Sequence, residues 1–276
     1  MPPPNKPTLP LHKDKAAPPL HSAAARSGSE ANAIIEVGPD RMKYHVQKAF
    51  LVHHSDYFHK ALSGTWKEAE DGVVTLVDVE PAIFNLFVEW LYTQQLPSSR
   101  SDYRRVADAN FSEDVCKIRL YVFADRFAVP ALRTAMNRQI VGERDVTSGL
   151  CWGVTQIAYA FDNLPTSDPV LDFLVDQYYT EWGGHSTFAE GLPQEFLLRF
   201  FRRVGSERAQ GRDVVAESFR VDFCTYHEHA TDADKSSCSH KPRLGGGHFV
   251  GLERPVRSET RSRSIVGSKR PATSSS

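Results

Sequence analysis

The segment between Pro81 and Leu91 constrains the fold of this chain more than any other. Its large apolar side chains recur at the three- and four-residue intervals of a helix: Ile83, Leu86, Phe87, Trp90 and Leu91. Phe84 and Val88 form a second apolar stripe beside the first, and a helix that is apolar nearly all round is a buried one. Pro81 suits the first helical position, where the missing N–H costs no hydrogen bond. The sequence therefore predicts one buried helix around which the other elements pack.

Extended patterns come before this helix and predict three strands, at residues 33–37, 42–46 and 73–77. Gly38-Pro39-Asp40 is a turn signal, so the first two strands are expected to form a hairpin. Two helical patterns fill the gap before the third strand, at residues 47–53 and 56–62. Ser55 is a suitable N-cap for the second of them.

Helical patterns resume farther along the chain. Residues 94–110 are polar and contain several arginines, and they predict a loop. Ser112 is a suitable N-cap for the next helix, and Pro130 opens another. Three more helical patterns begin near Leu150, Pro169 and Pro193. They are long enough to pack as an antiparallel extension of the first unit.

Composition separates a foldable middle from two tails. The chain has 276 residues, of which 41% are hydrophobic and 11% aromatic, which suffices for a core. Residues 1–30 are rich in proline, and residues 241–276 are rich in serine and basic side chains. Both stretches are poor in large apolar residues, so two disordered tails are predicted. The net charge of -1 gives no overall attraction to nucleic acid or membrane, and neither is an expected partner.

Cysteine usage and the N-terminus indicate a reducing compartment. The 4 cysteines are few and irregularly spaced, unlike a disulfide framework. The first residues hold no apolar run of signal-peptide length, and no apolar run approaches the length of a membrane span. The expected location is therefore the cytoplasm, the nucleus or both.

Short motifs spread over residues 33–145 indicate a known type of domain. They are Ile34-Ile35-Glu36-Val37-Gly38, Tyr44-x-Val46-x-Lys48-x-x-Leu51, Ser55-x-Tyr57-Phe58-x-x-Ala61-Leu62, Val74-x-Leu76, Pro81-x-x-Phe84-x-x-Phe87-x-x-Trp90-Leu91-Tyr92-Thr93 and Leu120-Tyr121-x-x-Ala124-Asp125-x-x-x-Val129-Pro130-x-Leu132. Together these motifs resemble a BTB/POZ domain, specifically one of the short fungal kind. The helical patterns from 150 to 205 are similar to the extension of fungal members.

The resemblance implies an α/β (α+β) fold in which a small sheet is flanked by helices, with a C-terminal helical extension. The expected organisation is a proline-rich tail at 1–30, a BTB/POZ domain at 32–145, the extension at 146–206, a Cys/His-containing segment at 207–240 and a basic tail at 241–276. Gln47 stands where the family often has a histidine, which argues against the co-repressor pocket of transcription-factor members. Residues 1–30 offer no counterpart of the swapped strand and helix, so a domain-swapped homodimer is not expected.

The functional class implied by the resemblance is a protein-interaction module. The sequence contains no G-x-S-x-G, Walker A or H-E-x-x-H motif, so an enzyme is not expected. The first hypothesis is an adaptor or scaffold, with a substrate adaptor for a cullin ubiquitin ligase as the specific candidate. The alternative is a nuclear, transcription-associated regulator that acts through BTB-mediated assembly.

Trp66-Lys67-Glu68 is the candidate partner-binding motif, and it is expected in a loop before the third strand. An apolar residue, any residue and then an acid at this place resemble the motif that BTB adaptors present to a cullin. An aromatic anchor beside a charge also has the composition of an interaction hot spot. The competing interpretation is that Trp66 packs on its own domain.

Cys224-x-x-His227-x-His229 and Cys238-x-His240 form the candidate metal site. Two thiolates and up to three imidazoles suit a tetrahedral structural zinc ion, the one cofactor that this pattern suggests. A two-residue gap lets one turn present two ligands. Cys224, His227 and Cys238 would be joined by His229 or, alternatively, by His240. The competing interpretation is a polar segment with incidental histidines and no cofactor.

Overall fold

The computed structural model describes residues 19, 32–64, 67–108, 111–142, 152–182, 190–210, 223–229 and 231–238. The chain divides into two compact units, residues 1–242 and residues 243–276, and the second lies entirely outside the described residues. The tails that the sequence predicts to be disordered lie outside them as well, apart from Pro19. All elements below belong to the first unit.

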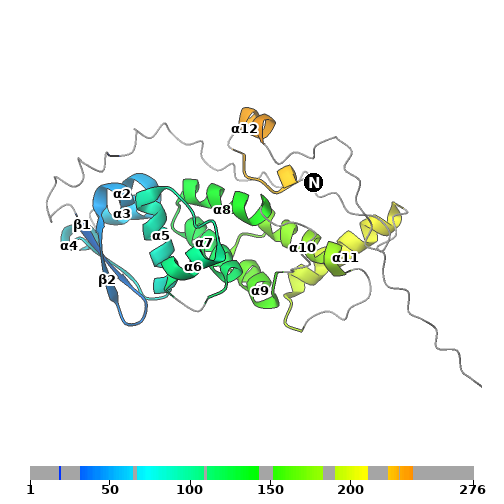
Figure 1. Ribbon diagram of the computed structural model, residues 1–276, viewed down its shortest axis with the longest axis horizontal. Coiled ribbons are helices and arrows are strands. Elements are labelled where there is room, and N and C mark those ends of the chain that lie inside the picture. The colour runs from blue at the N-terminus through cyan, green and yellow to red at the C-terminus, as the bar shows by residue number, and fades with distance from the viewer. Residues whose placement is uncertain are drawn as a thin grey trace, which may run out of the picture. The chain divides into compact units, whose positions relative to one another are not determined.

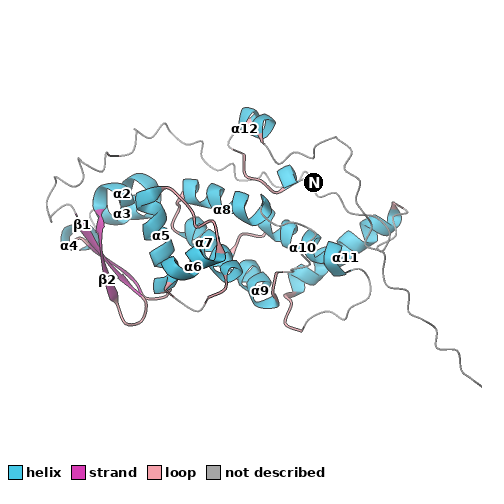
Figure 2. Ribbon diagram, viewed as in Figure 1, coloured by secondary structure: helices cyan, strands magenta, loops and turns pink. Residues whose placement is uncertain are grey.

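Within the described residues, three strands form one sheet in the order β2-β1-β3. Figures 1 and 2 show the first two strands, β1 and β2, beside each other. They span Asn32–Val37 (β1), Met42–Gln47 (β2) and Val73–Leu76 (β3). β1 is antiparallel to β2 and parallel to β3. Gly38 turns the hairpin with a φ of 77°, and a Cβ there would lie 3.3 Å from the Pro81 ring, so a glycine is needed. The three predicted strands are thus confirmed.

One face of the sheet is buried because its apolar residues alternate along the strands. Ala33, Ile35 and Val37 of β1 are buried. Val74 and Leu76 of β3 are buried beside them, in register with Ile35 and Val37. This period of two is that of a strand with one face in the core.

Two short helices connect the hairpin to the rest of the domain, α2 (Lys48–His54) and α3 (Asp56–Ser63). Ser55 stands between them and has the predicted capping role, because its Oγ accepts a hydrogen bond from the Phe58 N–H at 3.0 Å. The same hydroxyl donates to the Phe127 carbonyl at 2.6 Å. Ser55 therefore fixes the start of α3 and also ties it to a distant part of the chain.

The predicted buried helix is α5 (Pro81–Thr93), with Pro81 in its first turn. Trp90 is only 3% exposed. Phe87 packs against Phe123 with 4.9 Å between ring centroids, and Phe123 packs against Phe127 at 4.4 Å. These spacings are those of favourable aromatic pairs, and the helix is the centre of the apolar core.

The loop predicted over residues 94–110 is wrong for its second half, where α6 (Arg100–Ala107) forms. Ser99 caps this helix by accepting from the Asp102 N–H at 3.2 Å. Tyr103 and Ala107 are its buried residues, and the Tyr103 hydroxyl donates to Gln139 at 2.6 Å. Two buried positions among arginines leave only a weak apolar period, and the helix depends on tertiary contacts instead.

The remaining helices follow the predicted order: α7 (Glu113–Arg126), α8 (Pro130–Gly142), α9 (Val154–Asn163), α10 (Pro169–Trp182) and α11 (Gln194–Ala209). Ser112 caps α7 as predicted, and Pro193 is the N-cap of α11. α7 contacts both α8 and α9, and α10 contacts α8, α9 and α11, so the extension packs directly on the domain (Figure 1). None of the helices described here combines the length and the apolar composition needed to cross a membrane.

Candidate functional site

The C-terminal segment, residues 223–229 and 231–238, is the first candidate site. It contains a short 3-10 helix (Phe223–Thr225) and α12 (Asp232–Ser237). Tyr226 belongs to the apolar core, where its ring lies 5.6 Å from that of Phe173 on α10. The Tyr226 hydroxyl also donates to Asp176. The segment is therefore anchored in the fold at its centre.

Asn137 on α8 holds the backbone of the same segment. Its Nδ2 donates to the Tyr226 carbonyl at 3.0 Å, and its Oδ1 accepts from the Glu228 N–H at 3.1 Å. A neighbouring strand would pair with residues two apart in the same way. Because Asn137 is fully buried, each of these bonds would be costly to leave unmade.

Arg133 on α8 is the centre of an ionic cluster that the sequence analysis did not find. Its Nε donates to Glu228 at 2.9 Å, its Nη2 donates to Asp168 at 2.8 Å, and it also pairs with Asp125. Tyr121 adds its hydroxyl, 3.2 Å from both Asp168 and Glu228. Residues from α7, α8, the start of α10 and the C-terminal segment thus meet at one guanidinium.

Burial sets the protonation behaviour of this cluster. The Asp168 side chain is 0% exposed, and this burial raises its pKa, although Arg133 and the Val170 N–H oppose the shift. Burial also raises the pKa of the Tyr121 hydroxyl, and the Asp168 charge adds to the effect. For Arg133, burial disfavours the charged form, but the hydrogen bonds that it donates to Glu228 and the nearby charges raise its pKa overall. The guanidinium therefore stays charged.

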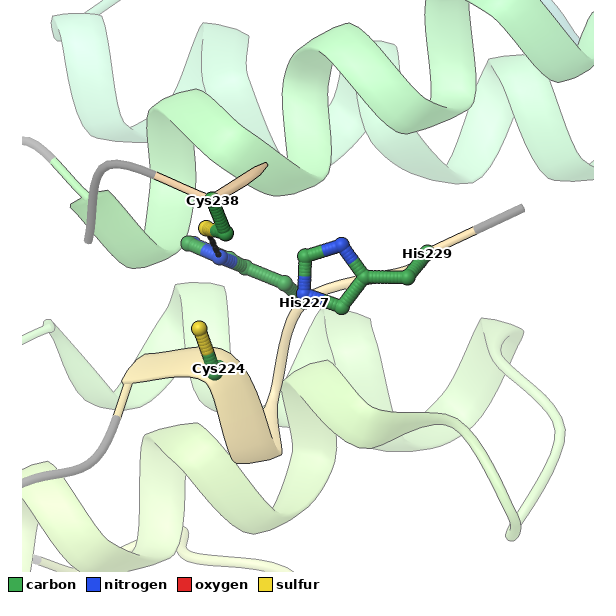
Figure 3. Close-up of side chains that lie close together, drawn as sticks. All are labelled: Cys224, His227, His229 and Cys238. Atoms are coloured by element: carbon green, nitrogen blue, oxygen red, sulfur yellow. Dashed lines mark hydrogen bonds between the residues drawn. The ribbon is translucent and has the colours of Figure 1, made fainter. Parts of the chain in front are cut away.

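Four of the predicted metal ligands, Cys224, His227, His229 and Cys238, are brought together by the structure (Figure 3). Their ligand atoms all lie within 4.8 Å of one another, and His227 Nδ1 is 3.3 Å from Cys238 Sγ. Neither cysteine forms a disulfide within the described residues. Cys224 and His227 are buried. His240, the alternative ligand, lies outside the described residues.

The histidine at position 229 has an unusual environment. Both of its ring nitrogens are buried, and neither has a hydrogen-bond partner among the residues that the structure describes. The Asp234 carboxylate lies 3.6 Å from Nδ1, beyond hydrogen-bond range. A buried polar group without a partner calls for a specific explanation, such as a bound ion.

The second candidate site is a groove of about 560 Å³ beside α3, α4 (Lys67–Asp71) and β3. It is lined by Tyr57, Lys60, Ala61, Glu68, Asp71 and residues 73–75. Glu68 is exposed and lies on α4, so the loop predicted at this position is wrong and a short helix takes its place. Trp66 lies outside the described residues.

The sequence analysis missed the residues that hold the C-terminal segment, namely Tyr121, Arg133, Asn137, Asp168, Tyr226 and Glu228. One signal was present in the sequence. Tyr226 and Glu228 alternate with His227 and His229, and such alternation indicates an extended segment with two different faces.

Comparison with known proteins identifies the N-terminal part of the fold. Residues 23–141 match the family model of the BTB/POZ domain. Over 62 residues the chain is 39% identical to BTB and MATH domain-containing protein 15 of Caenorhabditis elegans. These 62 residues are 22% of this chain and 22% of that relative. The match thus spans about a fifth of the relative's length. Residues 23–141 of this chain are therefore a BTB/POZ domain, a protein–protein interaction module, on a mixed α/β fold.

Proposed function

We propose that this protein is a non-enzymatic adaptor or scaffold, and that a cullin ubiquitin ligase is the partner of its BTB/POZ domain. The observation that carries the proposal is the exposed Glu68 on α4, at the edge of the groove beside α3 and β3. Glu68 is the acid of the Trp66-Lys67-Glu68 motif, so this one residue of the motif lines a concave surface that a partner can fill. The short fungal type of BTB/POZ protein is part of the same proposal.

The groove has the mixed character of a protein-binding surface. Tyr57 is 38% exposed, and its ring packs on Phe127 at 5.0 Å between centroids, so it offers a supported apolar contact. Glu68 and Asp71 supply acidic groups, and Lys60 a basic one. An aromatic contact surrounded by charges is typical of interface hot spots. A helical partner with an apolar side chain and a basic group beside it would fit this surface.

Part of the groove is held in place before a partner arrives. Ser55 caps α3 and is bonded to the Phe127 carbonyl, so the helix that carries Tyr57 and Lys60 is fixed from both sides. The β3 wall is fixed by its parallel pairing with β1. A preformed surface binds more tightly because less conformational entropy is lost on association.

Isothermal titration of the full chain with a purified cullin N-terminal domain tests the proposal. In the double variant Trp66→Ala/Glu68→Ala, binding should weaken by about 2 kcal/mol or more, roughly 30-fold, because a central anchor and its charge are removed. Glu89→Ala is the matched control, since Glu89 is an exposed acid on α5 outside the groove. Circular dichroism must show that both variants fold, which also tests whether Trp66 packs on its own domain.

If the double variant folds and binds as the parent does, or if the parent binds no cullin, the cullin proposal fails. A nuclear, transcription-associated regulator would then be the alternative. Gln47 weighs against that alternative, because it puts a neutral side chain at the start of α2, where the family often has a histidine. The adaptor proposal implies a protein of the cytoplasm, the nucleus or both, which imaging of a tagged chain would test.

A further inference from the structure

We propose that Cys224, His227, His229 and Cys238 bind one Zn²⁺ ion, and that this ion fastens the C-terminal segment to the helices of the fold. The proposal does not depend on a cullin partner. It rests on three observations: the convergence of the ligand atoms, the burial of His229, and the alternation of side chains along residues 226–229.

The ligand atoms converge on a site of the right size. In a tetrahedral site with Zn–S of about 2.3 Å and Zn–N of about 2.0 Å, ligand atoms lie about 3.3–3.8 Å apart. The 3.3 Å between His227 Nδ1 and Cys238 Sγ already matches, and no pair of ligand atoms is more than 4.8 Å apart. A contraction of about 1.5 Å at most, for any pair of ligand atoms, completes the geometry. Figure 3 shows the four side chains pointing toward one another.

The chemistry of the ligands favours zinc in a structural role. Two thiolates and two imidazoles form a closed set of four, which leaves no open position for a substrate or a water molecule. Carboxylates and carbonyls, which magnesium and calcium require, are not among the four ligands. The ion would also give one of the two buried ring nitrogens of His229 a partner that the described residues do not provide.

The alternation of side chains links metal binding to the rest of the fold. The side chains of His227 and His229 belong to the group of four candidate ligands. Tyr226 and Glu228 alternate with these histidines along the chain and face the helices. Tyr226 contacts Asp176, and Glu228 contacts Arg133. The ion thus holds one side of the segment while α8 and α10 hold the other. Loss of the ion should release Glu228 from Arg133 and expose Tyr226.

The decisive experiment is metal analysis of the full chain after purification without chelator. We expect about one zinc per chain, as for a structural Cys₂His₂ site. Cys238→Ser and His229→Ala should lower this content severalfold. Cys116→Ala and His59→Ala are the matched controls, because Cys116 lies on α7 and His59 is exposed on α3, both outside the cluster. Both controls should keep the metal of the parent.

A second measurement decides the outcome if a ligand variant fails to fold. The parent is stripped of metal and loaded with Co²⁺, whose visible spectrum reports tetrahedral geometry and whose thiolate charge-transfer band reports sulfur ligands. Hydrogen exchange of residues 223–238 should be fast in the stripped protein and slow again after loading with Zn²⁺. The proposal is overturned if the parent neither holds nor takes up metal. It is equally overturned if mass spectrometry finds a Cys224–Cys238 disulfide, or if the ligand variants keep the full metal content.

Discussion

The interior of the BTB/POZ domain and the contact between the helices and the C-terminal segment are stabilised by different interactions. This contact, here called the seam, consists of Tyr121, Asp125, Arg133, Asp168 and Glu228. Around α5 the contacts are apolar and largely aromatic, as in the chain of rings from Phe87 through Phe123 to Phe127. In the seam a partly buried arginine, Arg133, meets carboxylates from three separate parts of the chain. Apolar contact is nondirectional, whereas each charge of the seam needs its own partner.

This difference decides how each region responds to damage. Truncating a side chain in the apolar core removes contact area and leaves a cavity, so the loss grows with the volume removed. Removing one member of an ionic cluster leaves the remaining charges without a partner at a position that water solvates poorly. The core should therefore be sensitive to size, and the seam to the completeness of its partners.

The largest effect is expected in the core. Trp90→Ala should lower the free energy of unfolding by about 3–5 kcal/mol, the range for a buried large aromatic residue. Trp90 is 3% exposed, and its ring lies 5.4 Å from that of His54. Urea unfolding followed by circular dichroism measures the loss. Phe201→Ala is the control, since Phe201 is an aromatic residue of α11 that is 58% exposed and should change stability by less than about 1 kcal/mol. A Trp90 variant as stable as its control would contradict the role assigned to α5.

Most of the core could be predicted from sequence because apolar periodicity can be recognised within a short stretch of the chain. The α5 pattern, the three strands, and the caps at Ser55 and Ser112 each depend on neighbours within a few residues. α6 was missed because Tyr103 gains its burial and its bond to Gln139 from distant parts of the chain. α4 was missed for the opposite reason, since it is a short polar helix with no apolar period.

The second largest effect is expected in the seam. Arg133→Met should cost about 3 kcal/mol, because the fully buried Asp168 loses the cation that balances its charge. In the double variant Arg133→Met/Glu228→Gln the cost should be smaller than the sum of the two single changes, since one stranded charge has been removed. Urea unfolding of the four proteins completes the cycle. Strict additivity would show that Arg133 and Glu228 do not act together.

The seam was hidden from sequence analysis because its members are far apart in the chain. Glu228 lies 95 residues from Arg133, and nothing in either neighbourhood marks the pair. The metal ligands were found because they lie within one short stretch whose spacing carries a chemical meaning. Even so, the spacing left His229 and His240 as alternatives for the fourth ligand. The structure places His229 beside the other three, and His240 lies outside the described residues.

The smallest effect is a pH dependence carried by Asp168, small because Arg133 offsets part of the cost of burial. Desolvation raises the pKa of Asp168 in the folded protein above the ordinary value of 3.8. The folded state then binds this proton more tightly than the unfolded state, so its contribution to stability falls as pH rises from 3.8 through the folded pKa. Relative to Asp168→Asn, the parent should therefore lose stability over this window and level off above it.

Urea unfolding of both proteins at a series of pH values measures that difference. All other ionisable groups are the same in the two proteins, so their effects cancel to first order. Asparagine keeps an oxygen for the Val170 N–H that Asp168 accepts at 2.9 Å, so the start of α10 is preserved. If the parent instead gains relative stability as pH rises, attraction to Arg133 outweighs burial. The charge of Asp168 would then stabilise the seam through its ion pair with Arg133. The seam would differ from the apolar core more strongly than the burial of Asp168 alone suggests.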